Sequence, residues 1–452
     1  MHQPHLARAA TLALSMALAA ALSGQNDSTP VTAARPKRPH IVVIVSDDAG
    51  YQDFSVQGSK DIATPRIDSI AAGGVRFTNG YVSGAVCSPS RAGLMTGRYQ
   101  QRFGHELNIP PRFSEENGLP LTERTIADEL QAAGYRTIAL GKWHLGYADK
   151  FHPLSRGFEH YWGFLQGARS YFPLQKPTRL NRLLRDRKVQ AEAFDYMTDE
   201  LGRQAAAYIS QRGDEPLFVY LAYNAVHTPM HAVGADLEGL TGPQRRQKLV
   251  AMTHALDRSV GYVLDALDEA GIADDTLVFF VNDNGGATNN ASKNGALRGR
   301  KGSVWEGGIR VPFLARWPNG LPEGKVYDQP VIALDILPTC LAAAGQQQQG
   351  KLPLDGVDLL PHLRGRQSAP PHDVLLWRHG DKWAIRSGDW KLLQQGGGEA
   401  MLFDLANDVG EQQDRAAGEA ERVAALRSRY ETWDAQLIAP RWSYGKKRAG
   451  KK

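Results

Sequence analysis

His40-Ile41-Val42-Val43-Ile44-Val45-Ser46-Asp47-Asp48 is the stretch of sequence that decides the fold. Residues 41–45 are all β-branched and apolar, which is typical of a strand buried on both faces of a parallel sheet. The run then gives way to a serine and two aspartates, followed by Ala49-Gly50. A buried strand that delivers two carboxylates at its end predicts an α/β sheet with a polar site along its carboxyl edge.

The same pattern recurs further along the chain. Three more apolar runs span residues 136–140, 217–223 and 276–281. They are followed by side chains that can do chemistry, namely Lys142 and His144, His227, and Asp283 and Asn284. Helical patterns separate the runs at 122–133, 198–210 and 248–270. This alternation predicts a mostly parallel sheet flanked by helices, with the four sets of side chains gathered at one edge.

The second part of the chain has a different character. Residues 343–372 are polar and loop-like, and four short strands are expected beyond them, at 374–377, 382–387, 390–394 and 401–405. An amphipathic helix is expected over about 419–437. We therefore predict a catalytic domain over 39–365, followed by a small α+β domain over 366–440 that contains a short antiparallel sheet.

The first 24 residues have the pattern of a secretory signal. Arg8 provides a positive start, residues 9–22 form an apolar run, and small residues around 21–23 could be cleaved. The run is too short to span a bilayer, so no stable membrane insertion is expected, although an uncleaved anchor is the alternative reading. Residues 25–38 are expected to be a linker. The pattern predicts export to the periplasm or out of the cell.

The net charge of +5 is a property of the chain ends. Residues 1–40 carry +3 and residues 441–452 carry +6, which leaves −4 for the residues between them. The body is therefore mildly acidic, and the basic tail over 441–452 is expected to be a solvated end. No nucleic-acid-binding motif accompanies the positive charge, and we expect no nucleic acid partner.

The segment Cys87-Ser88-Pro89-Ser90-Arg91 is hard to explain as packing alone. A helix-like stretch follows and closes at Gly97, which places Cys87 at a helix N-terminus, where free N–H groups favour an anion. The alternatives are a buried free cysteine, or a disulfide with Cys340, the second of only two cysteines. Cys340 follows an apolar run at 332–339 that reads as a helix, and it is most simply a core residue.

Asp47, Asp48, Asp283 and Asn284 supply hard oxygen ligands from the ends of two strands. Three carboxylates brought together would repel one another without a cation. Ca²⁺ or Mg²⁺ would compensate them, and Asp and Asn oxygens suit the flexible coordination of calcium. Taken singly, each of these segments could instead be an ordinary turn or a helix cap.

The motif at 87–91 and the segment at 134–146 resemble the two signatures of the type I sulfatases, and the likeness extends from about Ile41 to about Asp408. The resemblance implies an alkaline-phosphatase-like fold. It implies that a maturation enzyme oxidises Cys87 to formylglycine, whose hydrated aldehyde attacks sulfur. It also implies one Ca²⁺ per chain, held by Asp47, Asp48, Asp283, Asn284 and modified Cys87.

The resemblance also implies the roles of the remaining site residues. Arg91 would stabilise the hydrate, Lys142 and Lys301 would bind sulfate, and His144 would assist the collapse of the hydrate. His227 would protonate the departing oxygen. Lys142 and His144 lie two residues apart, so both would face one ligand if the strand continued. The implied reaction is hydrolysis of sulfate monoesters on a sulfated polysaccharide or its oligosaccharides.

Two other functions compete with this one. A phosphonate or phosphate monoester hydrolase of the same superfamily could share the formylglycine. A carbohydrate-binding relative with an unmodified Cys87 would have no activity. Substrate choice is expected to depend on loops around His105, Arg169 and Tyr171, with His231 on the substrate side or at the surface.

Overall fold

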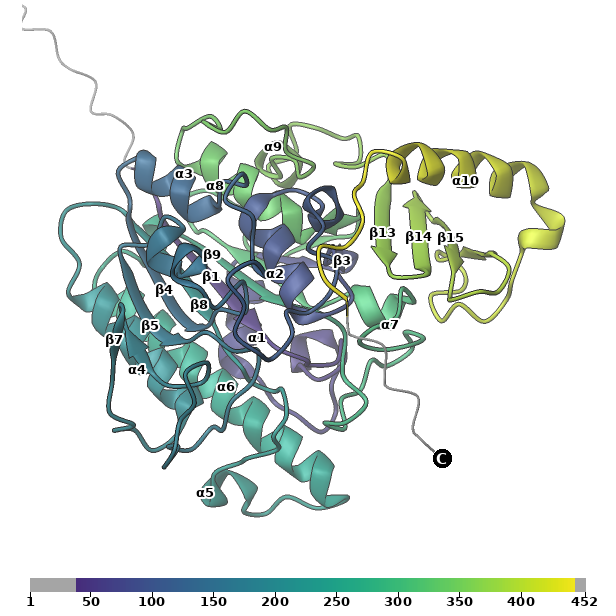
Figure 1. Ribbon diagram of the computed structural model, residues 1–452. Helices are drawn as coiled ribbons and strands as arrows, with labels where there is room; N and C mark the ends of the chain where they lie inside the picture. Colours follow the sequence, from purple (N-terminus) through teal and green to yellow (C-terminus); the bar gives the residue numbers. More distant parts are fainter. Residues whose placement is uncertain (1–37, 444–452) are drawn as a thin grey trace, which may run out of the picture. The chain divides into compact units, whose positions relative to one another are not determined.

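The central element is a ten-stranded sheet with the order β11-β2-β10-β9-β1-β8-β4-β5-β6-β7. Its middle strands are labelled in Figure 1. The computed structural model describes residues 38–443, so the predicted signal at 1–24, nearly all of the linker and most of the basic tail lie outside the described residues. The five middle strands are β9 (Thr276–Asn282), β1 (His40–Ser46), β8 (Leu217–Ala222), β4 (Arg136–Lys142) and β5 (His160–Phe164).

These five strands run parallel, as the sequence predicts. The register pairs Ser46 of β1 with Asn282 of β9 and Val45 with Ala222 of β8, so the strand ends are level. The outer pairings are mixed. Antiparallel neighbours are added by β10 (Phe313–Arg316), β2 (Val75–Phe77), β6 (Leu184–Arg185) and β7 (Lys188–Val189), while β11 (Lys325–Tyr327) is parallel to β2.

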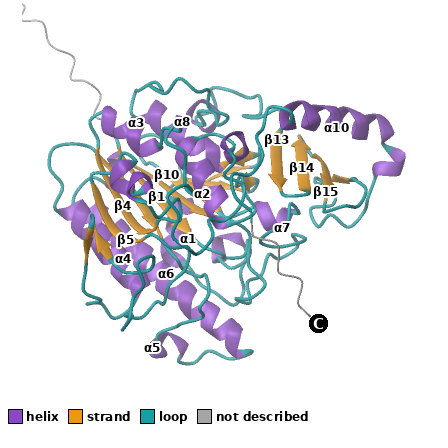
Figure 2. Cartoon of the chain, in the orientation of Figure 1, coloured by secondary structure: helices purple, strands orange, loops and turns teal. Residues whose placement is uncertain are grey.

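Helices cover both faces of the sheet (Figure 2). Ile41, Val43 and Val45 of β1 pack in one cluster with residues of α2 (Cys87–Thr96), α3 (Ile126–Ala132) and α8 (Ile336–Ala343). Val42 and Ile44 pack on the other side with α1 (Pro65–Ala72), α4 (Met197–Ser210) and α6 (Gln244–Glu269). The alternation of β1 between two cores explains why its residues are apolar without interruption.

A four-stranded antiparallel sheet follows, made of β13 (Leu375–His379), β14 (Lys382–Ser387), β15 (Trp390–Gln394) and β16 (Met401–Asp404). The helix α10 (Ala420–Asp434) packs on it, with the ring of Tyr430 stacked on Trp383 at 4.4 Å between centroids. This confirms the predicted C-terminal sheet and helix. The division of the chain at residue 365 stays a prediction.

The helix predicted over residues 332–339 is only partly formed. The short strand β12 (Val331–Ile332) pairs with β3 (Gly80–Tyr81), a 3-10 turn spans 333–335, and α8 begins only at Ile336. Asp335 causes the change, because its Oδ2 accepts the backbone N–H of Ile332 at 2.9 Å and closes the turn. Cys340 lies in α8 as a free, buried thiol, and Cys87 is also free, so the two form no disulfide.

The remaining helices are short. They are α5 (Gly234–Leu237), α7 (Glu306–Ile309) and α9 (Leu360–Leu363). Across residues 38–443, no helix combines the length and the apolar character needed to cross a membrane.

Candidate active site

The predicted site residues gather at the carboxyl edge of the parallel strands. β1 delivers Asp47 and Asp48, β9 delivers Asp283 and Asn284, β4 delivers Lys142 and His144, and the segment after β8 delivers His227. The helix α2 brings Cys87 and Arg91, and the loop before α7 brings Lys301. All are buried except His227 and Lys301, which are partly exposed.

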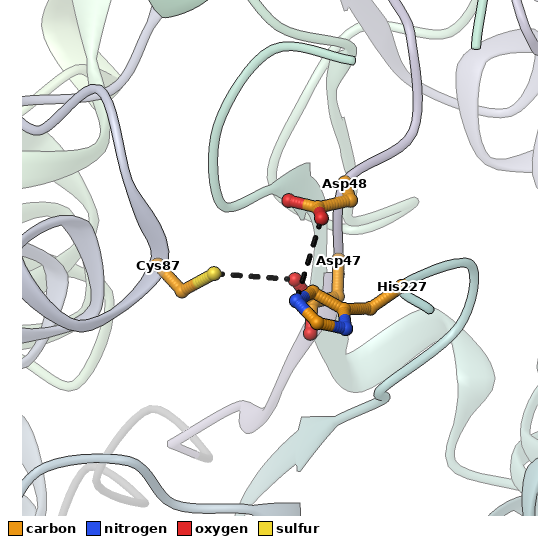
Figure 3. Close-up of side chains that lie close together, drawn as sticks. All are labelled: Asp47, Asp48, Cys87 and His227. Atoms are coloured by element: carbon orange, nitrogen blue, oxygen red, sulfur yellow. Dashed lines mark hydrogen bonds and ion pairs between the residues drawn. The ribbon is translucent and has the colours of Figure 1, made fainter. Parts of the chain in front are cut away.

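Four potential ligands lie at the centre of this group (Figure 3). One ligand atom from each of Asp47, Asp48, Cys87 and His227 lies within 4.8 Å of the others. The sulfur of Cys87 is 3.5 Å from Oδ1 of Asp47, and Nε2 of His227 is 3.5 Å from Oδ2 of Asp48. The first turn of α2 therefore faces the end of β1 across a small polar space.

Cationic side chains compensate the three carboxylates. Nζ of Lys142 is 2.5 Å from Oδ2 of Asp47, and Nζ of Lys301 is 2.6 Å from Oδ1 of Asp48. Arg91 pairs with Oδ2 of Asp283 at 2.8 Å. The chain itself therefore supplies cations beside these acids, and the metal ion expected from the sequence stays a prediction.

The electrostatic balance of the site nevertheless differs from one group to the next. Burial opposes ionisation of Asp47, but the attraction of Lys142 and other cations outweighs it and lowers the pKa of Asp47. Burial and the charge of Asp47 raise the pKa of Asp283 to about 6. One carboxyl of the group is thus held close to protonation, and an added cation would stabilise its charged form.

The thiol of Cys87 is a poor nucleophile in this environment. Burial, with the negative charges of Asp283 and Asp47, raises the pKa of Cys87 to about 12. Nζ of Lys301 lies 3.2 Å from the sulfur but does not reverse this. Because the thiolate is the reactive form of cysteine, the unmodified side chain is unsuited to attack an ester at neutral pH.

The ring of His227 lies between two hydrogen-bond acceptors. Its Nδ1 lies 2.5 Å from the carbonyl oxygen of Thr228, which can only accept, and its Nε2 faces the carboxylate of Asp48. A proton on either ring nitrogen would therefore have a hydrogen-bond acceptor. Tyr171 restrains the backbone at His227, because its Oη lies 2.8 Å from the carbonyl oxygen of His227 and can donate to it.

Asp48 and His144 both have left-handed backbone conformations, with φ of 62° and 58°. Such values are uncommon for residues with a side chain and concentrate at functional sites. The ring of His144 lies against Gly167, where an added Cβ would fall 2.4 Å from Cε1 of His144. Only glycine leaves room for the ring there.

The oxygen of Asn284 indicates that the site can hold a metal ion. Its Nδ2 donates to Oδ1 of Asp48 at 2.8 Å, but its Oδ1 is buried and has no hydrogen-bond partner among the described residues. A buried, unpaired amide oxygen beside carboxylates is a suitable calcium ligand. The donor set of Asp47, Asp48 and Asn284 therefore fits a hard divalent cation.

The loop residues expected near the substrate have other partners. Arg169 pairs with Glu192, the Oη of Tyr171 binds backbone carbonyls, and His105 is fully buried against Ser88. These side chains bind other parts of the protein and hold the loops around the site in place. A contact with substrate stays a prediction for this region, where Phe172 is exposed and His231 is partly exposed.

Solved structures with the same architecture cover almost the whole chain. The structure of Ps i-CgsB in complex with k-i-k-neocarrahexaose matches with a TM-score of 0.86 and 35% identity, over 91% of this chain and 96% of that one. The phosphonate monoester hydrolase of Agrobacterium radiobacter shares the fold, with a TM-score of 0.64 and 20% identity. The fold and the site define a hydrolase of the alkaline-phosphatase-like α/β class.

Sequence comparison narrows the class to one family. The Sulfatase family model matches residues 39–346. The chain is 34% identical to arylsulfatase A of Bos taurus, over 88% of this chain and 85% of that protein. It is 32% identical to N-acetylgalactosamine-6-sulfatase of Sus scrofa, over 79% of this chain and 72% of that protein. The chain belongs to the sulfatase family and is a sulfuric ester hydrolase.

Proposed function

We propose that the protein hydrolyses sulfate monoesters of a sulfated carbohydrate, with a formylglycine made from Cys87 and one bound Ca²⁺. The observation that carries the proposal is the position of Cys87, buried at the start of α2 with Lys301 and Asp47 against its sulfur. A thiol whose pKa is raised to about 12 has no evident use there as a nucleophile. The hydrate of formylglycine would supply one hydroxyl to attack sulfur and a second that allows sulfate to leave.

The oxygens of Asp47, Asp48, Asp283 and Asn284 would hold the calcium ion, which would withdraw charge from a sulfate oxygen. The lysines would bind the other sulfate oxygens. Lys142 and Lys301 each pair with a carboxylate now, and a bound sulfate group and metal ion would redistribute these contacts. Arg91 is completely buried and keeps the charge of Asp283 compensated.

His227 would give a proton to the departing alkoxide. Its ring is partly exposed, and both of its nitrogens face acceptors, which would hold a proton in place for transfer. Proton donation to the leaving group matters most for sugars, because their hydroxyls are poor leaving groups. His144, which follows β4, would accept the proton of the remaining hydroxyl of residue 87. Loss of that proton would allow sulfate to leave and would regenerate the aldehyde.

The substrate is proposed from the relatives. The neighbour at 35% identity was solved with a carrageenan-type hexasaccharide, and a curated relative is a sulfatase named for N-acetylgalactosamine. We therefore propose a sulfated oligosaccharide or polysaccharide substrate, and carrageenan oligosaccharides are the first to test. An exported protein, in the periplasm or outside the cell, would meet such polymers.

Maturation needs a partner enzyme. The side chain of Cys87 is 1% exposed in the folded protein, so an enzyme that oxidises the thiol must act before this region closes. The formylglycine-generating enzyme is therefore proposed to meet the unfolded or partly folded chain.

The function is tested by comparing rates on aryl sulfate, phosphate and phosphonate esters, together with the variant Cys87→Ser. We expect the sulfate ester to be hydrolysed fastest. Serine lacks the second hydroxyl, so the variant should accept one sulfuryl group and then stall, which intact mass would show as a stable adduct. A preference for phosphonate or phosphate esters would support the competing hydrolase. A protein with unmodified Cys87 that hydrolyses none of these esters would support the carbohydrate-binding relative.

A further inference from the structure

Ser88, the residue after the reactive position, is held at both of its polar groups by one loop. Its backbone N–H, at the first turn of α2, donates to Oδ1 of Asn108 at 2.9 Å. Its Oγ lies 2.6 Å from Nε2 of His105 and 2.6 Å from the carbonyl oxygen of His144. Ser88 thus connects the start of α2 to the backbone of His144, and the loop at 105–108 holds Ser88 in place.

The direction of these hydrogen bonds follows from their chemistry. The carbonyl oxygen of His144 can only accept, so the single proton of the Ser88 hydroxyl points to it. Nε2 of His105 must then carry a proton and donate to Oγ of Ser88. Burial and the nearby charge of Arg441 lower the pKa of His105 to about 3, so the ring stays neutral and the arrangement persists at working pH.

Trp442, near the C-terminal end of the described residues, packs against this loop. Its ring lies edge-on to His105 at 4.7 Å between centroids, and its Nε1–H is within 3.1 Å of the carbonyl of Leu107 and 3.0 Å of that of Asn108. The N–H of Arg441 also donates to the carbonyl of Gly104 at 2.9 Å. The indole therefore sits against both residues that hold Ser88.

We infer that His105, Ser88 and Trp442 form a positioning device, which holds residue 87 and the backbone of His144 in the geometry that the reaction needs. The inference rests on the proposed function for its catalytic meaning. His144 has a left-handed backbone conformation, and such a conformation persists only where its surroundings maintain it. The hydrogen bond from Ser88 to its carbonyl oxygen is one such restraint.

The substitutions Ser88→Ala, His105→Phe and Trp442→Phe test the device. Phenylalanine at 105 keeps a flat ring against the indole but removes the donor to Ser88. We expect each variant to lower kcat on 4-nitrophenyl sulfate about tenfold, counted per chain that carries formylglycine, with KM within about twofold, because small displacements of reacting groups slow the chemical step. The double variant Ser88→Ala, His105→Phe should be no slower than Ser88→Ala alone.

His152→Phe is the matched control. His152 is also a buried histidine, with its ring edge-on to Tyr161 at 5.2 Å, but it lies outside the proposed device. We expect this variant to lose stability and keep kcat. Equal kcat for His105→Phe and the wild type, or independent effects of the Ser88 and His105 substitutions, would overturn the inference.

A second measurement needs no activity. Amide hydrogen exchange of residues 143–146 should be faster in His105→Phe and Ser88→Ala than in the wild type, and unchanged in His152→Phe. Unchanged exchange in all variants would overturn the inference even in a protein without turnover. A wild type that carries no formylglycine or cleaves no sulfate ester would instead overturn the proposed function, and the exchange result would still decide the role of His105.

Discussion

Individual residues at this site depend on close packing by their neighbours. Asp48 and His144 are held in left-handed conformations, and the ring of His144 fits only because residue 167 has no side chain. Arg91 is buried with its charge directed at Asp283. These features predict large effects from small substitutions.

Gly167→Ala should slow the reaction. The new methyl group would lie 2.4 Å from Cε1 of His144, so the ring must move, and we expect kcat to fall about tenfold or more. Gly234→Ala is the control, since its added Cβ would meet nothing within 4 Å. Steady-state kinetics on an aryl sulfate compare the two. A Gly167→Ala enzyme as fast as the Gly234→Ala enzyme would show that the position of His144 does not matter.

Arg91→Met should destabilise the protein as well as inactivate it. Removal of the guanidinium leaves Asp283 as a buried carboxylate with its direct partner gone, and breaking such a pair costs about 3–5 kcal/mol. Arg203→Met is the control, because Arg203 forms an exposed pair with Glu200 and should contribute less than about 1 kcal/mol. Urea denaturation measures both. Equal losses in the two variants would contradict the role assigned to Arg91.

At the scale of elements, the C-terminal sheet holds the loop that carries Lys301. Lys391 of β15 pairs with Glu306 at 2.8 Å and with Glu411 at 2.9 Å, and all three side chains are fully buried. Glu306 begins α7, five residues after Lys301, and Lys382 of β14 donates to the carbonyl oxygen of Gly302 at 2.6 Å. The small sheet therefore helps to fix the position of Lys301 by holding the loop on which it lies.

The shared lysine predicts a pH dependence of stability. Burial opposes ionisation of both acids, but Lys391 lowers the pKa of Glu306 to about 2, while burial and the charge of Glu306 raise the pKa of Glu411 to about 7. The folded state thus holds a proton on Glu411 that the unfolded chain releases near pH 4.5. The contribution of Glu411 to the free energy of unfolding is therefore fully present below pH 4.5 and is lost as the pH rises through 7.

Glu411→Gln should remove that loss, because glutamine is neutral at every pH. Unfolding free energies at pH 5 and pH 8 should differ less in this variant than in the wild type. Glu116→Gln, at a side chain that is 78% exposed, should leave the difference unchanged. A wild type whose stability rises over this range, with the same slope in Glu411→Gln, would contradict the assignment.

The sequence predicts the middle of the sheet well and its edges poorly. Strand β1 is recognisable because both of its faces are buried, so residues 41–45 include no polar position. Strands such as β2 and β11 have three residues each, too few for a pattern to emerge. The 3-10 turn at 333–335 depends on one hydrogen bond that the backbone N–H of Ile332 donates to the Asp335 carboxylate, and hydropathy does not encode it.

The same contrast holds for the site. The strand ends and the motif at 87–91 predict that Asp47, Asp48, Cys87 and His227 lie in one place, whereas Lys301 was expected only from the family resemblance. The partners that hold them were not predictable, because Ser88 and Trp442 are joined through a loop and lie far apart in the chain. Charge compensation within the site was also missed, since the contacts of Lys142 and Lys301 with the aspartates arise only in the folded protein.

At the scale of the whole molecule, the match to the sulfatase family extends over most of the described chain. The remaining questions are whether the protein binds a metal ion and whether Cys87 is modified. The sulfatase model spans residues 39–346, and the structural match with Ps i-CgsB extends over 91% of the chain. The phosphonate hydrolase match shows only that the fold is shared. The bound calcium ion and the modified Cys87 are proposed for the mature protein, and each has a direct test.

Removal of calcium should abolish activity and lower stability together. A chelator should reduce the melting temperature, and added Ca²⁺ at 100 times its Kd should restore about 2.7 kcal/mol. Asn284→Leu removes the unpaired oxygen while keeping a similar side-chain volume, so it should weaken the calcium-dependent shift. A melting temperature that ignores both chelator and calcium in the wild type would contradict the metal site.

The most direct test of the central claim is the mass of the peptide that contains residue 87, measured on purified protein that hydrolyses a sulfate ester. The account predicts an aldehyde at that position, in a fraction of chains that rises and falls with specific activity between preparations. Fully active protein with only an unmodified thiol at Cys87 would contradict it.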